Sequence, residues 1–199
     1  MKHLIAGLLA AACLSAQAAA PVATIQAMLA KPDQLCGRFD QSKQLAGMKK
    51  PLASSGKFCV VAGKGVLWRT LKPFANTLRL TRDEIVQTQG ERVAMRLEAS
   101  REPTVRMING VLFSLLSGDL HQLESLFEVD GSVSGDTWKV SLKARNAALA
   151  RAVGTISLDG GAYVRTIRMV EESGDRTDIR FLDIKTGAGA VLPEEAAQL

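Results

Sequence analysis

Apolar and polar residues alternate along most of the chain beyond residue 35, a pattern typical of antiparallel strands that bury one face. Turn sequences such as Asp159-Gly160-Gly161 and Ser173-Gly174-Asp175 separate the alternating runs, as expected for hairpins. The pattern therefore predicts a meandering antiparallel sheet. Its strands are expected at residues 37–43, 55–61, 66–70, 76–81, 84–88, 92–97, 129–133, 137–142, 154–158, 163–170 and 177–184.

Three segments follow a helical period instead. Residues 21–29 begin with Pro21, which suits a first helical position, and Pro32 ends the pattern. Residues 103–117 carry an apolar stripe, and Gly118 and Asp119 fit the cap positions between this segment and a second short helix over 120–127. Residues 193–199 form an acidic, alanine-rich tail that we expect to be frayed.

A sheet with this many strands is expected to curl, because strand twist accumulates and free edges are a liability. The helices that interrupt it need an apolar partner, and the concave side of a curled sheet provides one. Aromatic residues make up only 5% of the chain, so Leu, Val, Ile and Met would dominate this interior. Such a lining suits flexible acyl chains, although any aliphatic core has the same composition.

The first 18 residues have the three-part layout of a secretory signal peptide. Met1-Lys2-His3 is basic, residues 4–14 are almost wholly apolar, and Ala16-Gln17-Ala18 is a small-x-small cleavage site. The apolar run is too short to span a bilayer, and no later segment approaches the required length. Cys13 offers lipidation as an alternative, but the usual Leu three places earlier is absent. We expect an exported protein whose residues 19–199 form one domain.

The formal net charge is +5, and the basic residues are scattered rather than clustered, which gives no support for nucleic-acid binding. His121 is the only histidine beyond the leader, and no C-x-x-C spacing occurs, so neither a metal site nor a base for nucleophilic catalysis is indicated. Glu171, Glu172, Asp175 and Asp178 cluster at a turn, where solvated charges are the ordinary explanation. We expect a protein without catalytic activity, cofactor or metal.

Two cysteines, Cys36 and Cys59, remain after removal of the leader. Export places them in an oxidising compartment, where an even pair indicates a disulfide. If the first two strands pair around a loop centred near residue 48, the two cysteines lie opposite each other, close enough to bond. Two buried thiols are the alternative.

Three motifs in the first strands are similar to the periplasmic lipoprotein carriers of the LolA-like family. They are Gly37-x-Phe39-x-Gln41, Pro51-Leu52-x-Ser54-x-Gly56-x-Phe58 and Gly65-Val66-Leu67-Trp68-x-Thr70-x-x-Pro73. The resemblance implies an unclosed β-barrel with helices as a lid over an apolar cavity. It also implies delivery of acylated lipoproteins across the periplasm, from an inner-membrane donor to an outer-membrane acceptor.

The chain departs from the family pattern at one position. The carriers have an Arg-Pro pair before the tryptophan strand, and here Ala62 and Gly63 occupy those places. The cysteine pair is not a general carrier feature either. Both departures suggest a divergent member whose cargo is a lipoprotein, a free lipid, a lipid-linked precursor or an acylated metabolite.

We expect a monomeric carrier whose cavity is lined by apolar residues of alternating strands and covered by the helix at 103–117. The candidate lining residues are Phe39, Phe58, Trp68, Leu78, Leu80, Met95 and Leu97. The candidate lid residues are Val111, Leu112 and Leu115. A one-residue error in register would reverse a whole strand. The alternative is an interaction or sensing module of the same fold, with these residues as plain core and no transported cargo.

Overall fold

The computed structural model describes residues 22–102, 110 and 121–199. The described helices are α1 (Val22–Met28), α3 (His121–Glu124), α4 (Ala147–Val153) and α5 (Pro193–Ala196). The strands are β1 (Gln34–Gln44), β2 (Leu52–Val61), β3 (Gly65–Lys72), β4 (Asn76–Thr81), β5 (Glu84–Gln89), β6 (Arg92–Glu98), β7 (Phe127–Ser134), β8 (Thr137–Ala144), β9 (Thr155–Gly160), β10 (Val164–Val170) and β11 (Arg176–Thr186).

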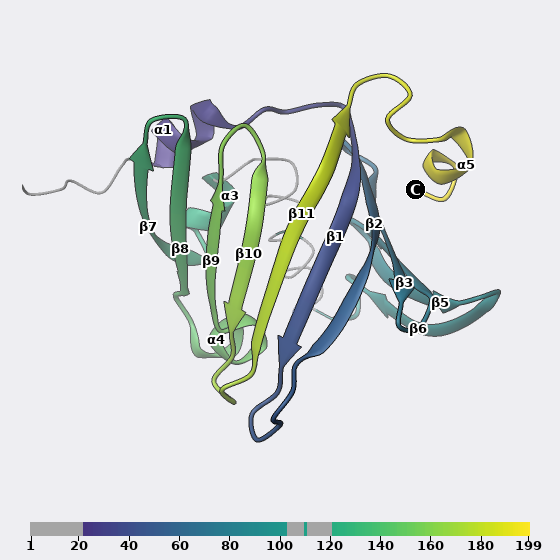
Figure 1. The fold of residues 1–199 in the computed structure, drawn as a ribbon, viewed down its shortest axis with the longest axis horizontal. Helices are drawn as coiled ribbons and strands as arrows, with labels where there is room; N and C mark the ends of the chain where they lie inside the picture. The colour runs from purple at the N-terminus through teal and green to yellow at the C-terminus, as the bar shows by residue number, and fades with distance from the viewer. Residues whose placement is uncertain (1–21, 103–109, 111–120) are drawn as a thin grey trace, which may run out of the picture.

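The strands of the described chain form one eleven-stranded antiparallel sheet in the order β6-β5-β4-β3-β2-β1-β11-β10-β9-β8-β7. Strands that follow one another in sequence pair with each other except β6 and β7, and the first strand β1 also pairs with the last strand β11 (Figure 1). Strands β6 and β7 lie at the two edges and do not pair with each other, so the sheet is not closed. The expected meandering antiparallel sheet is confirmed.

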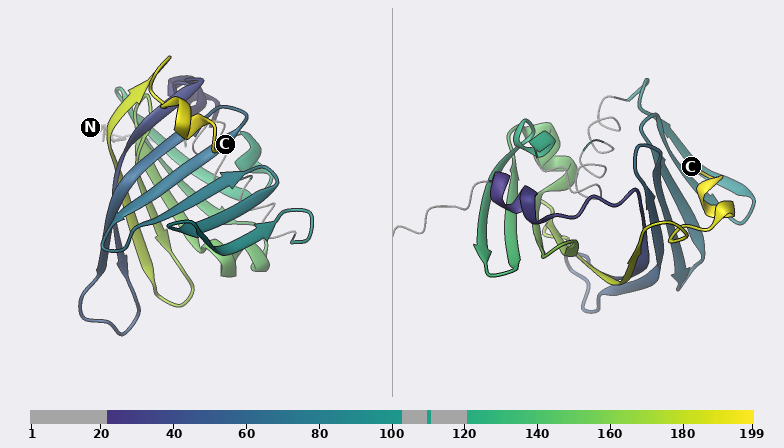
Figure 2. Two further views of the ribbon diagram at one scale, coloured as in Figure 1. Left: turned by 90° about the vertical axis from the view of Figure 1, so that its right-hand side faces the viewer. Right: turned by 90° about the horizontal axis from the view of Figure 1, so that it is seen from above.

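The sheet curls so strongly that its two ends face each other. Viewed from above, β7 and β8 stand opposite β3 to β6, so the curled sheet has the outline of a trough (Figure 2). Strand twist alone bends a sheet of this width, and the ladders contain four irregularities that add local bending. They occur between Cys36 and Arg38, Ser55 and Gly56, Gln87 and Thr88, and Val164 and Thr166.

The largest apolar cluster lies on the concave side. Along β8 the burial pattern alternates strictly, with Trp138, Val140 and Leu142 buried and their neighbours more exposed. Helices α1 and α3 pack against β7, and α4 packs against β8. They contribute buried side chains to the same cluster, including Ile25 and Leu149. The concave face at this end of the sheet is therefore covered by helices.

Two segments differ from the expectations drawn from sequence. Residues 193–199 were expected to fray, and this prediction is wrong: α5 lies on the outer face of the sheet, and Val191 and Leu199 pack in a second apolar cluster with Cys59. Helix α4 was not predicted. Its signals are Asn146, whose side chain accepts a hydrogen bond from the Leu149 backbone N–H at 2.8 Å, and the cap residue Gly154.

Several expectations fall on residues outside those described. They are the signal peptide at 1–18, and all of the predicted lid helix at 103–117 except Gly110. The lid and the cavity beneath it therefore stay predictions. Among the described helices, none is long and apolar enough to cross a membrane.

Candidate functional site

The seven candidate lining residues lie on the concave face of the sheet. The cross-strand register places Phe58 opposite Trp68, and Trp68 opposite Leu78. In the same way Leu80 lies opposite Ile85, which lies opposite Leu97. Because directly paired residues project from the same face, one register links all of these side chains. All seven belong to the main apolar cluster or pack against it.

Three of the seven form an aromatic cluster with a fourth ring. Phe39 stacks on Trp68 with ring centroids 3.8 Å apart, and Phe58 lies 4.8 Å from Phe181. The Trp68 ring meets Phe181 edge-on at 6.1 Å. Phe39, Phe58 and Phe181 are buried, whereas Trp68 is partly exposed. The centre of the concave face is therefore filled by the chain's own rings, with the indole at the margin.

A glycine permits this arrangement. Gly56 pairs with Phe39 on one side and Thr70 on the other, at the irregularity in β2. A Cβ atom at Gly56 would lie 1.9 Å from the backbone oxygen of Arg69 and 2.9 Å from the Phe39 ring. The close approach of β3 and the seat of the Phe39 ring both require the absence of a side chain.

The remaining four lining residues form an aliphatic wall on β4 and β6. Leu80 is buried, but Leu78, Met95 and Leu97 keep part of their surface exposed. On β8 and β9 the corresponding concave side chains, such as Leu142 and Leu158, are almost fully buried, whereas Val129 and Val133 on the edge strand β7 are partly exposed. The two ends of the trough therefore differ: one is a packed core, and the other presents partly exposed apolar surface.

Sequence reasoning missed several members of this face, among them Phe181 and Ile85. Phe181 follows Ile179 at strand spacing, and its pairing with Phe39 brings it to the centre of the sheet. Ile85 occupies the equivalent place on β5. Alternation was the available signal for both. The candidate lid residues Val111, Leu112 and Leu115 lie outside the described residues, so their relation to this face stays a prediction.

The outer face carries a second feature, a groove of about 710 Å³ beside a disulfide. Cys36 and Cys59 are directly paired across β1 and β2, with Cα atoms 4.1 Å apart, and their sulfur atoms are bonded. The predicted disulfide is thus present at the predicted register. The groove lies between these strands and the C-terminal segment. Its lining residues are Cys36, Gly37, Arg38, Lys57, Phe58, Cys59, Asp183, Ile184, Lys185, Gly189, Ala190, Leu192 and Glu195.

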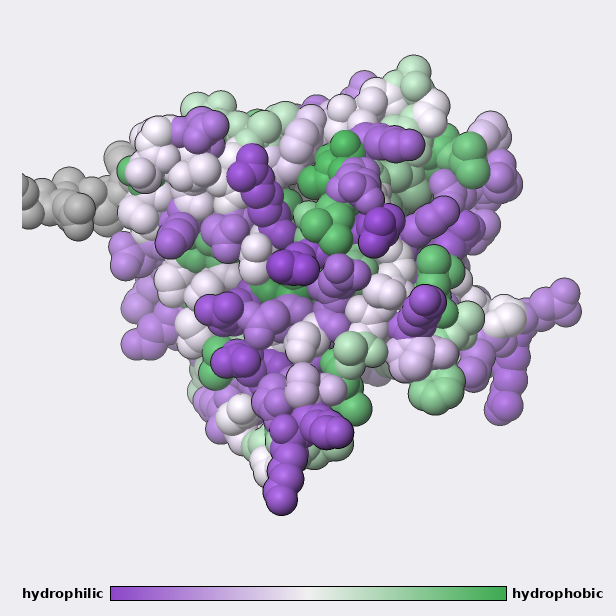
Figure 3. Space-filling view, in the orientation of Figure 1, coloured by the Kyte–Doolittle hydropathy of each residue, from purple (hydrophilic) through white to green (hydrophobic). Residues whose placement is uncertain are grey.

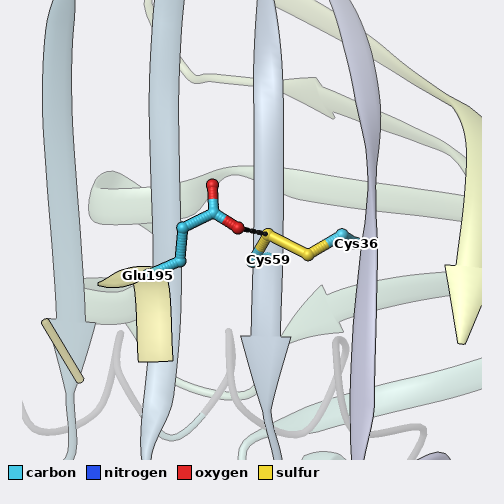
Figure 4. Close-up of side chains that lie close together, drawn as sticks. All are labelled: Cys36, Cys59 and Glu195. Atoms are coloured by element: carbon cyan, nitrogen blue, oxygen red, sulfur yellow. Dashed lines mark hydrogen bonds between the residues drawn. A yellow bond between two sulfur atoms is a disulfide. The ribbon is translucent and has the colours of Figure 1, made fainter. Parts of the chain in front are cut away.

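Glu195 holds the C-terminal segment against the outer face (Figure 4). Its Oε1 accepts a hydrogen bond from Arg69 Nη1 at 2.9 Å, and its Oε2 accepts one from the Leu192 backbone N–H at 3.2 Å. Oε2 also lies 3.4 Å from Cys59 Sγ. Because that sulfur is bonded to Cys36, it has no proton to donate and no thiolate to offer a metal. The cluster of two cysteines and a glutamate is therefore a structural contact in this state.

The face of the molecule seen in Figure 3 is mainly hydrophilic with several apolar patches, and the outer surface also carries ion pairs. Arg168 Nε and Arg176 Nε lie 2.5 and 3.0 Å from the two carboxylate oxygens of Asp178. Hydrogen bonding to Asp178, together with its charge, raises the pKa of Arg168 above the ordinary value. Such exposed pairs contribute little stability and indicate no catalytic role.

The acidic turn that the sequence singled out has a structural role. Glu171 pairs with Lys43 at 3.3 Å, and Asp175 Oδ1 accepts a hydrogen bond from the Ala46 backbone N–H at 2.8 Å. These contacts join the β10–β11 turn to the β1–β2 hairpin. The carboxylates therefore connect two loops of the sheet rather than assemble a catalytic pair.

Comparison with protein families gives one match of nearly full length. The model of a family described as outer membrane lipoprotein carrier protein LolA-like matches residues 13–199. No curated protein matches the chain.

Solved structures with similar folds have low sequence identity. A LolA superfamily protein from Nitrosomonas europaea aligns with a TM-score of 0.45 and 8% identity over 87% of this chain and 93% of that chain. A DUF1329 family protein from Desulfovibrio piger aligns with a TM-score of 0.46 and 11% identity, over 84% of this chain and 91% of that chain. A chain of the Pseudomonas aeruginosa MucA/MucB complex aligns with a TM-score of 0.41 and 15% identity, over 88% of this chain and 60% of that chain.

Proposed function

Because this chain belongs to the LolA-like family of outer membrane lipoprotein carrier proteins, we propose that it is a periplasmic carrier of acyl chains. It binds the chains of a lipoprotein or lipid on the concave face of its curled sheet and transfers them towards the outer membrane. It receives its cargo from an inner-membrane donor, releases it to an outer-membrane acceptor, and has no enzymatic activity of its own.

The observation that carries the proposal is the partly exposed apolar wall on the concave face of β3, β4 and β6. Trp68, Leu78, Met95 and Leu97 remain partly accessible there, whereas helices pack against β7 and β8 at the opposite end of the sheet. Covering such surface with an acyl chain is favourable by about 0.8 kcal/mol for each methylene removed from water. The wall is not purely apolar, because Gln87 lies between Leu78 and Met95 in the register.

Two further parts of the proposal concern residues outside those described. Residues 1–18 direct export and are removed, so that the mature protein begins near Ala19. The helix at 103–117 then closes over the acyl chain, with Val111, Leu112 and Leu115 towards it. N-terminal sequencing of periplasmic protein tests the first part, and a lipid-modified start at Cys13 would replace the soluble carrier with an anchored one.

Trp68 provides a direct test of acyl binding on the concave face. Bromine quenches indole fluorescence on contact, so a brominated fatty acid bound on this wall should quench Trp68. Trp138 is the control, because it is buried under the helices and its Nε1 donates a hydrogen bond to the Gly161 carbonyl at 2.7 Å. We expect saturable quenching in the wild type and its loss in Trp68→Phe. Equal quenching in both proteins would contradict the proposed site.

A second function is favoured by the aromatic cluster. Phe39, Phe58 and Phe181 fill the centre of the concave face by themselves, as expected for an interaction or sensing module without transported cargo. Organic extraction of the purified protein followed by mass spectrometry separates the two functions. Co-purifying acyl lipid supports the carrier. A lipid-free protein that also fails to bind the brominated probe supports the module.

A further inference from the structure

Several large apolar side chains are exposed on neighbouring connections at one end of the sheet. Phe74 is 76% exposed, Leu71 52% and Leu52 51%, and Met48 is also exposed. These residues lie in two neighbouring connections: residues 45–51 with the start of β2, and the turn between β3 and β4. Strand β2 pairs with β3 so that Ser55 lies opposite Lys72, which brings both connections to the same end. We call residues 48–52 and 71–74 the apolar-basic end.

The hairpin part of the apolar-basic end, residues 48–52, projects from the molecule, and residues 71–74 lie beside its base. Strand β3 pairs with β2 only as far as Ser55, whereas β1 and β2 continue to the pair of Lys43 and Leu52. The β1–β2 hairpin therefore extends past its neighbour on that side, and it forms the lowest point of the molecule in Figure 1. A projecting hairpin can reach a flat surface that the body of the sheet cannot.

Three lysines lie among these apolar residues. Lys49, Lys50 and Lys72 are exposed, and no ion pair recorded among the described residues involves any of them. The nearby acidic groups lie on the opposite flank of the hairpin, where Glu171 pairs with Lys43 and Asp175 accepts the Ala46 N–H. The flank towards β3 is therefore both apolar and positively charged.

This combination matches the chemistry of an anionic membrane surface. Aromatic and aliphatic tips enter the boundary between headgroups and acyl chains, while lysine ammonium groups remain at the level of the phosphates. A folded protein gains nothing from exposing Phe74, Leu71 and Leu52 together, and such patches mark interaction sites. We propose that the apolar-basic end docks the protein on a bilayer that contains anionic phospholipid. The docking surface is distinct from the concave face and does not depend on cargo.

Vesicle co-sedimentation of the full mature protein tests the proposal. We expect binding to vesicles of phosphatidylcholine mixed with phosphatidylglycerol at low ionic strength, and weak binding to phosphatidylcholine alone. Phe74→Ser should weaken binding roughly tenfold, because it removes the most exposed apolar side chain. Replacing Lys49, Lys50 and Lys72 by Gln should weaken it roughly fivefold for each lysine and remove its salt dependence.

Matched controls lie elsewhere on the molecule. Leu192 is as exposed as Leu52 but belongs to the C-terminal segment, and Lys64 is exposed in the turn at the opposite end of the sheet. Leu192→Ser and Lys64→Gln should bind vesicles like the wild type. Wild-type protein that ignores anionic vesicles, or equal losses in the control variants, would overturn the proposal. So would a dimer, detected by sedimentation, that Phe74→Ser converts to a monomer, since the patch would then be an interface between copies. Binding of the brominated fatty acid should be unchanged in all of these variants.

Discussion

Single residues decide which side of the sheet each chemical group faces. Cys36 lies opposite Cys59, and both point to the outer face, whereas Leu35 and Val60, the adjacent pair, point inward to the main apolar cluster. A shift of one residue in β2 would turn the Cys59 sulfur to the concave face and bring Phe58 into water. The disulfide therefore stabilises the register on which the concave face depends.

Removing the disulfide should destabilise the protein without changing its fold. The bond closes a loop with a sequence separation of 23, for which chain entropy predicts a loss of about 3 kcal/mol. We expect Cys36→Ala/Cys59→Ala to unfold at lower urea concentration than the wild type, as measured by circular dichroism. Thiol titration of denatured, unreduced wild-type protein should find no free thiol. Two free thiols would contradict the bond.

Gly56→Ala should be costly for a different reason. Its Cβ atom would overlap the backbone oxygen of Arg69, and a backbone atom cannot move aside as a flexible side chain can. We expect a loss of roughly 1–3 kcal/mol in unfolding free energy and a changed near-ultraviolet signal from the stacked Phe39 and Trp68. Ser54→Ala, two residues away on the same strand, is the control and should change neither quantity. A fully stable Gly56→Ala variant would show that β3 can move away.

At the scale of elements, the position of the C-terminal segment depends on contacts with residues distant in sequence, which no local pattern indicates. Its acidic, alanine-rich sequence predicts fraying, yet Arg69, distant in the chain, pairs with Glu195. Val191 and Leu199 add apolar contacts with Cys59. The tertiary contacts therefore override the local propensity, and the segment covers the disulfide instead of extending into solvent.

Glu195→Ala should release this segment. The variant loses the hydrogen bonds to Arg69 and to the Leu192 N–H, which together stabilise docking by about 2 kcal/mol. Carboxypeptidase digestion followed by mass spectrometry should trim the variant faster than the wild type, while the rest of the sheet stays folded. Glu194→Ala is the matched control, because Glu194 is exposed and adjacent in sequence. Similar trimming rates for the two variants would show that Glu195 does not secure the segment.

The elements that sequence could predict are those whose signal is local. Alternation located the strands and assigned Phe39, Phe58 and Trp68 to one face, and the hairpin length placed the two cysteines opposite each other. Phe181 reaches the same cluster only because β11 pairs with β1, a contact between the first and last strands of the sheet. Glu195 likewise contacts Cys59 only because the C-terminal segment folds back onto β2, which is distant in sequence. Local patterns do not specify which distant strands meet, so alternation could give the face of β11 that Phe181 occupies but not the cluster that it joins, and no local signal indicated the contact of Glu195.

At the scale of the whole molecule, the curled sheet has two unlike ends. Helices α1, α3 and α4 pack against β7 and β8, and the concave side chains of β8 and β9 are almost fully buried. The concave face of β4 and β6 keeps Leu78, Met95 and Leu97 partly exposed. An unclosed sheet allows this asymmetry, because one edge can complete a stable core while the other remains accessible. The first end then supplies stability, and the second is available for binding.

A matched pair of substitutions tests whether one end of the sheet supplies stability and the other binds the acyl chain. Met95 lies on the edge strand β6 and is partly exposed, whereas Leu142 lies on β8 and is fully buried. In Leu142→Asp the carboxylate has no route to water and no charged partner, so we expect a loss of at least about 4 kcal/mol or complete unfolding. In Met95→Asp the carboxylate can turn to solvent, so the melting temperature should fall only slightly. The charge would nevertheless repel an acyl chain, and we expect binding of the brominated fatty acid to weaken by at least roughly tenfold.

Thermal unfolding and Trp68 quenching, measured on both variants and the wild type, give the two readouts. Normal probe binding by Met95→Asp would remove β6 from the binding site. An unfolded Met95→Asp would instead make Met95 part of the packed core and favour the interaction module.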